Sequence, residues 1–214
     1  MMTRNTNILP LLLCWLLSMF LGRHAVAVEV CGPNAATSDP GYEAGRAHDD
    51  FDGDGCADFC RVVGIAPNNE RVSCLISHGP LAVREVLSGN VEDGKPFDWG
   101  HAWTRAWIDI NDDGKTDYCR TVDSQAPNSE AILRCTLSAG DRFGDVVESN
   151  GLPDWGREDE PRSYEFIDDA WHVCFVARDA PPSRTDCHSV RLTDGALQVS
   201  KKPALVKDGR PTAK

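Results

Sequence analysis

The feature that most constrains this chain is an acidic, glycine-containing segment that occurs twice. It is Asp-Phe-Asp-Gly-Asp-Gly-Cys-Ala-Asp-Phe-Cys at residues 50–60, and Asp-Ile-Asn-Asp-Asp-Gly-Lys-Thr-Asp-Tyr-Cys at residues 109–119. Oxygen-bearing side chains occupy positions 1, 3, 5 and 9, and glycine occupies position 6. Alternating acids in a tight loop direct several carboxylates at one centre, as a hard cation such as Ca²⁺ requires, and the glycine permits the sharp turn. The segment therefore predicts two calcium sites.

The expected ligands are the side chains at positions 1, 3, 5 and 9 and the carbonyl oxygen at position 7. In the first loop these are Asp50, Asp52, Asp54, Asp58 and the carbonyl of Cys56. In the second loop they are Asp109, Asn111, Asp113, Asp117 and the carbonyl of Lys115.

An EF-hand is a poor alternative for these loops. It needs a bidentate glutamate at position 12 and a helix on each side. Here position 12 is Arg61 or Arg120, and residues 58–63 and 117–122 are rich in aromatic and β-branched side chains, which favours strands. Each loop is therefore expected to lead into a strand. A solvated acidic turn without metal is the remaining alternative, because Asp and Gly are common in turns.

The ends of the chain differ from its centre. Residues 1–27 have the basic start, the apolar run at 8–22 and the small residues at 25–27 of a secretory signal peptide. That apolar run is short for a membrane span. We therefore expect a secreted or periplasmic protein with no transmembrane anchor, in which residues 28–199 form the folded domain. Residues 200–214 are polar, basic and aperiodic, and are expected to be a disordered tail.

The formal net charge of −11 limits the classes of partner. An acidic surface repels phosphate groups, which argues against nucleic acid and anionic membrane as partners. Part of the acidic excess lies in the two loops, where bound Ca²⁺ would neutralise it. The net charge therefore says less about partners than its size suggests.

Cysteines are paired around proline-containing turns. The three pairs are Cys60 and Cys74, Cys119 and Cys135, and Cys174 and Cys187. A turn midway between two cysteines predicts a β-hairpin in which they face each other and form a disulfide. The chain has nine cysteines, and without Cys14 in the leader eight remain, an even number typical of exported proteins. By elimination, Cys31 and Cys56 are expected to pair. No CxxC pair is present, which argues against zinc.

Loops and hairpins together define three units, at about 36–94, 95–153 and 154–197. Asp168 lies 59 residues after Asp109 and so keeps the phase of the repeat. The third loop nevertheless lacks the glycine and the acids of positions 5 and 9, so we expect no calcium there.

These units resemble FG-GAP/VCBS-type repeats, the calcium-loop-bearing blades of integrin-like propellers and of many exported bacterial proteins. Residues 39–47, running into the loop at 50–61, carry the closest resemblance, which extends over nearly all of residues 36–197. It implies an all-β fold of three β-propeller-blade-like antiparallel repeats, supports the calcium ligands named above, and implies no catalytic residues. The disulfide in each hairpin and the degenerate third loop depart from the family pattern.

The number of units leaves the assembly open. Propellers have four to eight blades, and repeats bury a core only against their neighbours. Either the chain self-associates as a homo-oligomer to complete a ring, or its three sheets form a compact, disulfide-braced unit, which we favour because disulfides suit a modest core.

No catalytic motif is apparent, because the histidines are scattered and neither an HExxH nor a GxSxG sequence occurs. Trp103 lies off the repeat pattern and is a candidate for binding, since aromatic faces suit sugar or peptide recognition, although core packing is the commoner role of tryptophan. We therefore expect a non-catalytic module that binds a glycan or a protein at a cell surface. The alternatives are a secreted hydrolase that uses carboxylates and a structural subunit of an exported assembly.

Overall fold

The structure is a computed structural model that describes residues 39–64, 70–78, 83–89, 91–92, 95–123, 131–149, 151, 162–176 and 184–208. The described residues form antiparallel β-sheets, and their one helical element is a short 3-10 turn, η1 (Ala102–Thr104). No helix in this part of the chain is long and apolar enough to cross a membrane. The expected signal peptide at residues 1–27 lies outside the described residues.

Each of the three sequence units forms one sheet. Sheet 1 contains, in order, β1 (Ala47–Asp49), β2 (Asp58–Val63), β3 (Arg71–Ser77) and β4 (Val83–Leu87). Sheet 2 contains β7 (Ala106–Ile108), β8 (Asp117–Asp123), β9 (Ala131–Ser138) and β10 (Phe143–Glu148). Sheet 3 contains β11 (Ser163–Ile167), β12 (Ala170–Val176), β13 (Arg184–Thr193), β14 (Ala196–Val199) and β15 (Leu205–Asp208), the last two both paired with β13. A small pair, β5 (Val91–Glu92) and β6 (Lys95–Pro96), lies between sheets 1 and 2 in the sequence. The all-β, three-unit prediction is confirmed.

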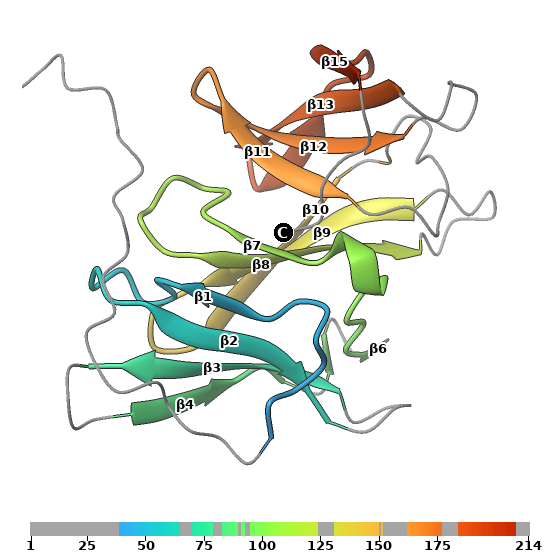
Figure 1. Ribbon diagram of the computed structural model, residues 1–214. Coiled ribbons are helices and arrows are strands. Elements are labelled where there is room, and N and C mark those ends of the chain that lie inside the picture. The colour runs from blue at the N-terminus through green and yellow to red at the C-terminus, as the bar shows by residue number, and fades with distance from the viewer. Residues whose placement is uncertain are drawn as a thin grey trace, which may run out of the picture.

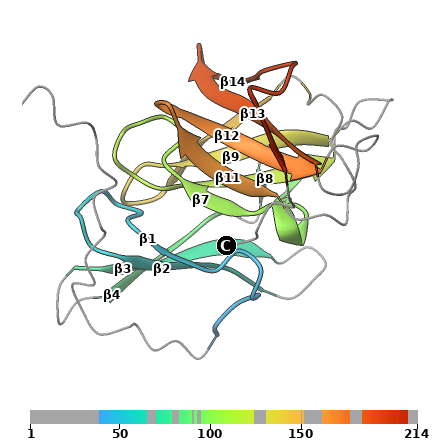
Figure 2. The same cartoon turned by 45° about the horizontal axis from the view of Figure 1, so that its top comes forward.

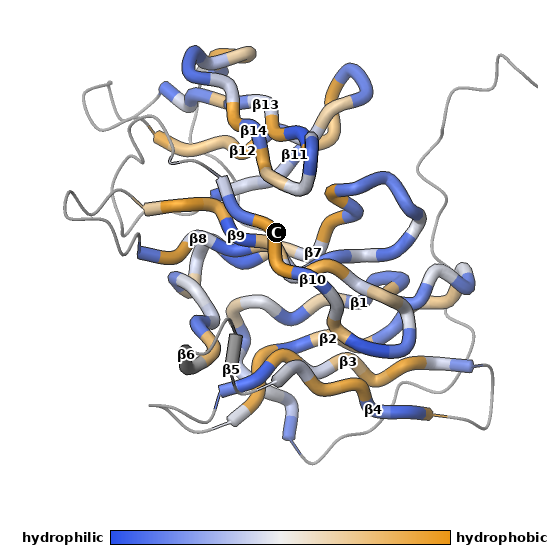
Figure 3. The backbone as a smooth tube through the Cα atoms, turned by 180° about the vertical axis from the view of Figure 1, so that it is seen from behind, coloured by the Kyte–Doolittle hydropathy of each residue, from blue (hydrophilic) through white to orange (hydrophobic). Residues whose placement is uncertain are grey.

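The three sheets stack in chain order, with sheet 2 between the other two (Figures 1 and 2). One hydrophobic cluster joins sheets 1 and 2, and in it Phe51 and Val62 pack with Trp107 and Tyr118. A second cluster joins sheets 2 and 3, and includes Leu133, Val147, Val173, Phe175 and Val190. Apolar residues lie mainly within the strands, whereas the loop between β7 and β8 is mostly hydrophilic (Figure 3). Neither cluster contains residues of both sheet 1 and sheet 3, so the stack is open within the described residues.

Backbone carbonyls before the first strand of one sheet accept hydrogen bonds from the next sheet, and this contact recurs. Between sheets 1 and 2 the bonds are Arg105 Nη1 to Ala44 O and Trp107 Nε1 to Gly45 O, each 2.9 Å. Between sheets 2 and 3 they are Arg162 N to Trp103 O and Tyr164 Oη to Thr104 O, also 2.9 Å each. The repeat in sequence is therefore also a repeat of the inter-sheet contact.

A disulfide joins the two central strands of each sheet. The bonds are Cys60–Cys74, Cys119–Cys135 and Cys174–Cys187, and in each pair the two residues lie directly opposite in the register. The hairpin prediction is thus confirmed. Each bond stabilises the fold by roughly 3 kcal/mol in the chain-entropy model. Cys56 is also disulfide-bonded, but Cys31 lies outside the described residues, so the Cys31–Cys56 pairing stays a prediction.

The prediction of a disordered tail from residue 200 is wrong for Leu205–Asp208. This segment forms β15 and pairs antiparallel with β13. Lys207 of β15 also forms an ion pair with Glu165 of β11. A flat sheet would hold the backbones of these strands roughly 14 Å apart, with β12 and β13 between them, so the two long side chains reach towards each other across sheet 3. The sequence did not indicate β15 because four residues are too few for a periodic pattern.

Candidate metal centres

The first acidic loop joins β1 to β2 and is shaped by hydrogen bonds from its own backbone. Asp50 Oδ1 accepts from the N–H groups of Gly53 (2.7 Å) and Asp54 (3.1 Å), and Asp50 Oδ2 accepts from Gly55 (2.8 Å). Asp54 Oδ1 accepts from the N–H of Cys56 at 2.8 Å. Gly55 has a φ of 88°, which a residue with a Cβ adopts only at a cost. The carboxylates of positions 1 and 5 are therefore held in place by backbone N–H groups of their own loop.

The second loop, between β7 and β8, has the same internal hydrogen bonds. Asp109 accepts from the N–H groups of Asp113 (3.0 Å) and Gly114 (2.9 Å), and Asp113 accepts from Lys115 (2.9 Å). Gly114 has a φ of 84°. The two loops therefore share one local conformation, and the glycine at position 6 has the role expected for it.

The aspartate at position 9 is buried in both loops and begins the following strand. Asp58 accepts N–H groups from Phe51 (2.9 Å) and Ser77 (2.8 Å), and is fully buried. Burial raises the pKa of Asp58 to about 6, against the effect of these two hydrogen bonds. The backbone N–H of Ser77 comes from the end of β3, so this carboxylate joins the loop to the centre of its sheet.

Asp117 repeats this arrangement in sheet 2. It accepts N–H groups from Ile110 (3.1 Å) and Ser138 (2.7 Å), and burial raises its pKa to about 7. Burial also raises the pKa of Asp52 and of Asp109. A divalent cation beside these carboxylates would favour their charged form and so oppose the cost of burial.

Three carboxylates of the first loop converge. Oxygens of Asp50, Asp52 and Asp58 all lie within 4.8 Å of one another, a spacing that suits one shared cation. In the second loop Asn111 supplies an amide oxygen at the position of Asp52. The structure thus brings together side-chain oxygens of the first loop that the sequence predicts as ligands.

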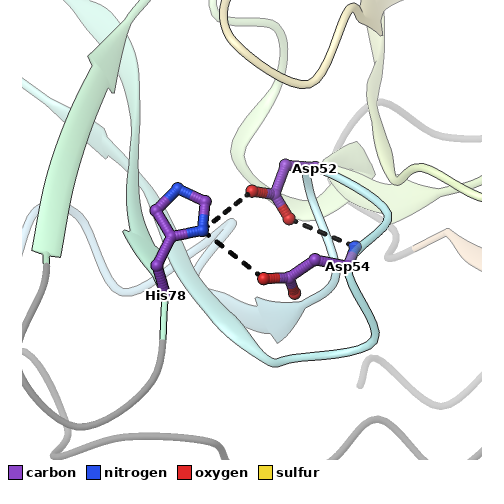
Figure 4. Close-up of side chains that lie close together, drawn as sticks. All are labelled: Asp52, Asp54 and His78. Atoms are coloured by element: carbon purple, nitrogen blue, oxygen red, sulfur yellow. Dashed lines mark hydrogen bonds and ion pairs between the residues drawn. The ribbon is translucent and has the colours of Figure 1, made fainter.

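His78 also lies at the first loop, although it is not among the predicted ligands. Its Nδ1 is 3.6 Å from Asp52 Oδ2 and 3.5 Å from Asp54 Oδ2, as Figure 4 shows. His78 directly follows β3, whose last residue, Ser77, binds Asp58. The sequence feature that could have predicted the position of His78 is the end of β3. Because β3 pairs with β2, which begins where the loop ends, the end of β3 must lie close to the loop.

At the second loop the nearby basic side chain is a lysine. Lys115 Nζ is 3.2 Å from Asp113 Oδ2. Lys115 itself occupies position 7, where its backbone carbonyl is the expected ligand. The ammonium therefore partly neutralises the loop but cannot coordinate a metal, since it has no free lone pair.

The first loop rests on sheet 2. Thr116 donates its N–H to Asp50 O at 2.9 Å, and Ser138 Oγ donates to Phe51 O at 2.6 Å. The backbone of the first loop is therefore bonded directly to Thr116 of the second loop and to Ser138 at the end of β9.

The third unit has a two-residue turn where the other units have a loop of eight residues, 50–57 and 109–116, between the first two strands. Asp168 and Asp169 have φ values of 50° and 57° and connect the directly paired residues Ile167 and Ala170. The indole N–H of Trp171 donates to Asp109 O at 2.6 Å. In this way Trp171 binds the position-1 carbonyl of the second loop, as Thr116 binds that of the first.

Trp103, the candidate binding residue, lies apart from the acidic side chains in η1. Its side chain is 58% exposed, the largest value among the exposed large hydrophobic residues described. Its carbonyl accepts the N–H of Arg162 at 2.9 Å, which holds the backbone while the indole faces solvent.

Comparison with known proteins adds no family. A scan against models of protein families finds none that matches the chain, and a search of curated proteins finds no similar sequence.

Proposed function

We propose that this protein is an exported, calcium-stabilised β-repeat module that binds a ligand and does not catalyse a reaction. One observation carries the proposal: two loops, 59 residues apart, hold acidic side chains in the same conformation around a buried aspartate. Such a loop is costly without a cation, because burial disfavours the charged carboxylate. Calcium removes this cost in both units.

The proposed ligands are all oxygen atoms, which is what favours calcium. The first centre uses Asp50, Asp52, Asp54, Asp58 and the carbonyl of Cys56, and the second uses Asp109, Asn111, Asp113, Asp117 and the carbonyl of Lys115. Ca²⁺ accepts six to eight oxygens in a flexible geometry, whereas Mg²⁺ demands a near-ideal octahedron and keeps several waters. A loop with four side chains and one carbonyl suits the larger ion.

Membership of the FG-GAP/VCBS repeats is part of this proposal. It is supported by the position of each acidic loop, which joins the first and second strands of a four-stranded antiparallel sheet. Three disulfides are compatible with an extracellular setting. The exposed indole of Trp103 is the proposed contact for a glycan or a protein at a cell surface.

Calorimetric titration of the mature, disulfide-intact protein tests the calcium centres. We expect two bound ions per chain, one ion in Asp54→Ala and in Asp113→Ala, and two ions in the control Asp168→Ala. Equal melting temperatures in calcium and in chelator would overturn the proposal.

A glycan array probed with the native protein and with Trp103→Ala tests the binding surface. Signals that do not depend on Trp103 would place the binding surface elsewhere on the protein.

A further inference from the structure

We propose that the first centre also accepts a transition-metal ion such as Zn²⁺ or Co²⁺, with His78 as a nitrogen ligand, so that the two loops differ in metal selectivity. This inference rests on the proposed function in that it takes the first loop to be a metal centre. It adds a ligand that the repeat pattern does not contain and a class of ion that an all-oxygen loop does not select.

The imidazole is already placed for coordination. One atom, Nδ1, faces both carboxylates, at 3.6 Å from Asp52 Oδ2 and 3.5 Å from Asp54 Oδ2 (Figure 4). The three ligand atoms lie within 4.8 Å of one another. Around a tetrahedral ion with bonds of about 2.1 Å, neighbouring ligands are about 3.4 Å apart. An ion can therefore bind between these three groups with little movement of His78.

The backbone fixes the imidazole at this position. Ser77, the residue before His78, donates its N–H to Asp58 at 2.8 Å, which ties the end of β3 to the loop. His78 directly follows β3, whereas Asp52 and Asp54 lie in the loop between β1 and β2, so the imidazole approaches the loop from outside it. The side chain of His78 is 45% exposed, which leaves the centre accessible to ions from solvent.

The second loop is a natural control for the first. Ser138 binds Asp117 as Ser77 binds Asp58, but the residue that follows is Ala139. The cation found at the second loop is Lys115, whose ammonium cannot act as a ligand. The second centre is thus limited to oxygen ligands, and only the first has an imidazole at its carboxylates among the described residues.

Ligand chemistry gives the direction of the selectivity. Imidazole suits zinc, copper and nickel, whereas Ca²⁺ takes oxygen ligands. His78 should therefore contribute strongly to the binding of Zn²⁺ or Co²⁺ and little to the binding of Ca²⁺. Two carboxylates and one imidazole leave a coordination position open for water or for a group of a bound partner.

Titration of the untagged protein with Zn²⁺, and of a parallel sample with Ca²⁺, tests the inference. We expect the native protein to bind Zn²⁺ at the first loop, and His78→Ala to weaken that binding at least tenfold, the lower end of what loss of a supporting ligand contact costs. Calcium affinity should change less than twofold. The visible spectrum of bound Co²⁺ should lose its nitrogen-ligand features in the same variant. The matched control is His48→Ala, since His48 stacks on Phe59 outside the cluster, and it should retain Zn²⁺.

Each outcome is decisive. Calcium binding without zinc binding, or zinc binding that His78→Ala leaves unchanged, overturns the inference and leaves the proposed calcium function intact. Zinc binding that depends on His78, without calcium binding, supports the inference and overturns the calcium proposal. Binding of neither ion overturns both.

Discussion

The buried aspartates at position 9 should make the metal-free protein lose stability as the pH rises from 5 to 8. The pKa of Asp58 is raised to about 6 and that of Asp117 to about 7, from an ordinary value of 3.8. A carboxyl group with a raised pKa binds its proton more tightly in the folded state. Its contribution to stability is therefore complete below pH 3.8 and is lost as the pH rises through 6 and 7.

The size of the effect follows from these values. Between pH 5 and pH 8 the free energy of unfolding falls by roughly 3 kcal/mol from Asp117 and by roughly 1 kcal/mol from Asp58, by proton linkage. The pKa values of Asp52 and Asp109 are raised as well, so their contributions have the same sign. A fall of about 4 kcal/mol corresponds to a melting temperature lower by roughly 8–16 °C in a domain of this size.

Thermal melts in chelator, followed by circular dichroism at pH 5, 6, 7 and 8, measure this slope. Saturating calcium should flatten it, because the ion replaces the protons and adds about 2.7 kcal/mol at one hundred times its dissociation constant. Calcium binding at pH 6.5 should also release protons, which calorimetry detects as a dependence of the heat on the buffer. The variant Asp117→Asn should lose most of the slope, because it removes the group with the larger shift. A metal-free melting temperature that is constant or rises from pH 5 to pH 8 would refute the reasoning.

Three further perturbations test other parts of the fold. Gly100→Ala should destabilise the fold by roughly 2–4 kcal/mol, because Gly100 has a φ of 73° and the added Cβ would lie 2.7 Å from Thr121 O. The control is Gly195→Ala, where φ is 75° but no neighbour lies within 4 Å of the added Cβ. In denaturant titrations this control should lower the free energy of unfolding by only about 1 kcal/mol. Cys187→Ser should lower the melting temperature of calcium-saturated protein far more than Asp168→Ala, since it removes a disulfide worth roughly 3 kcal/mol, and equal effects would contradict this. Trp171→Phe should cost about 1–2 kcal/mol through loss of the hydrogen bond to Asp109 O, and an unchanged unfolding midpoint would show that the bond contributes nothing.

The sequence predicts much of this fold because its signals are local and occur more than once. Cysteines placed symmetrically about a turn determine which residues of a hairpin face each other, and Cys60–Cys74 and its two equivalents follow directly. The acidic loops are also local, since Asp50 and Asp109 bond to N–H groups within five residues of themselves. Such features need no knowledge of the tertiary structure.

What the sequence did not reveal depends on contacts between distant segments. His78 comes 24 residues after Asp54, and only the pairing of β2 with β3 brings the two together. The burial of Asp117 likewise requires the end of β9 beside the loop, where Ser138 donates to it. Neither contact is visible in the acidic loop itself, because the partner residue comes from the far end of the hairpin that follows the loop.

The boundaries between the sheets repeat, but sheet 3 differs from sheets 1 and 2 in its strands. Sheets 1 and 2 share one apolar cluster, sheets 2 and 3 share another, and the inter-sheet hydrogen bonds recur at both boundaries. Sheet 3 then departs from the pattern, because β15 extends it along β13 and the pair between Lys207 and Glu165 joins its two edges. Sheet 3 is therefore not a copy of sheets 1 and 2, because it has a fifth strand along β13 where each of those sheets has four strands in a single order.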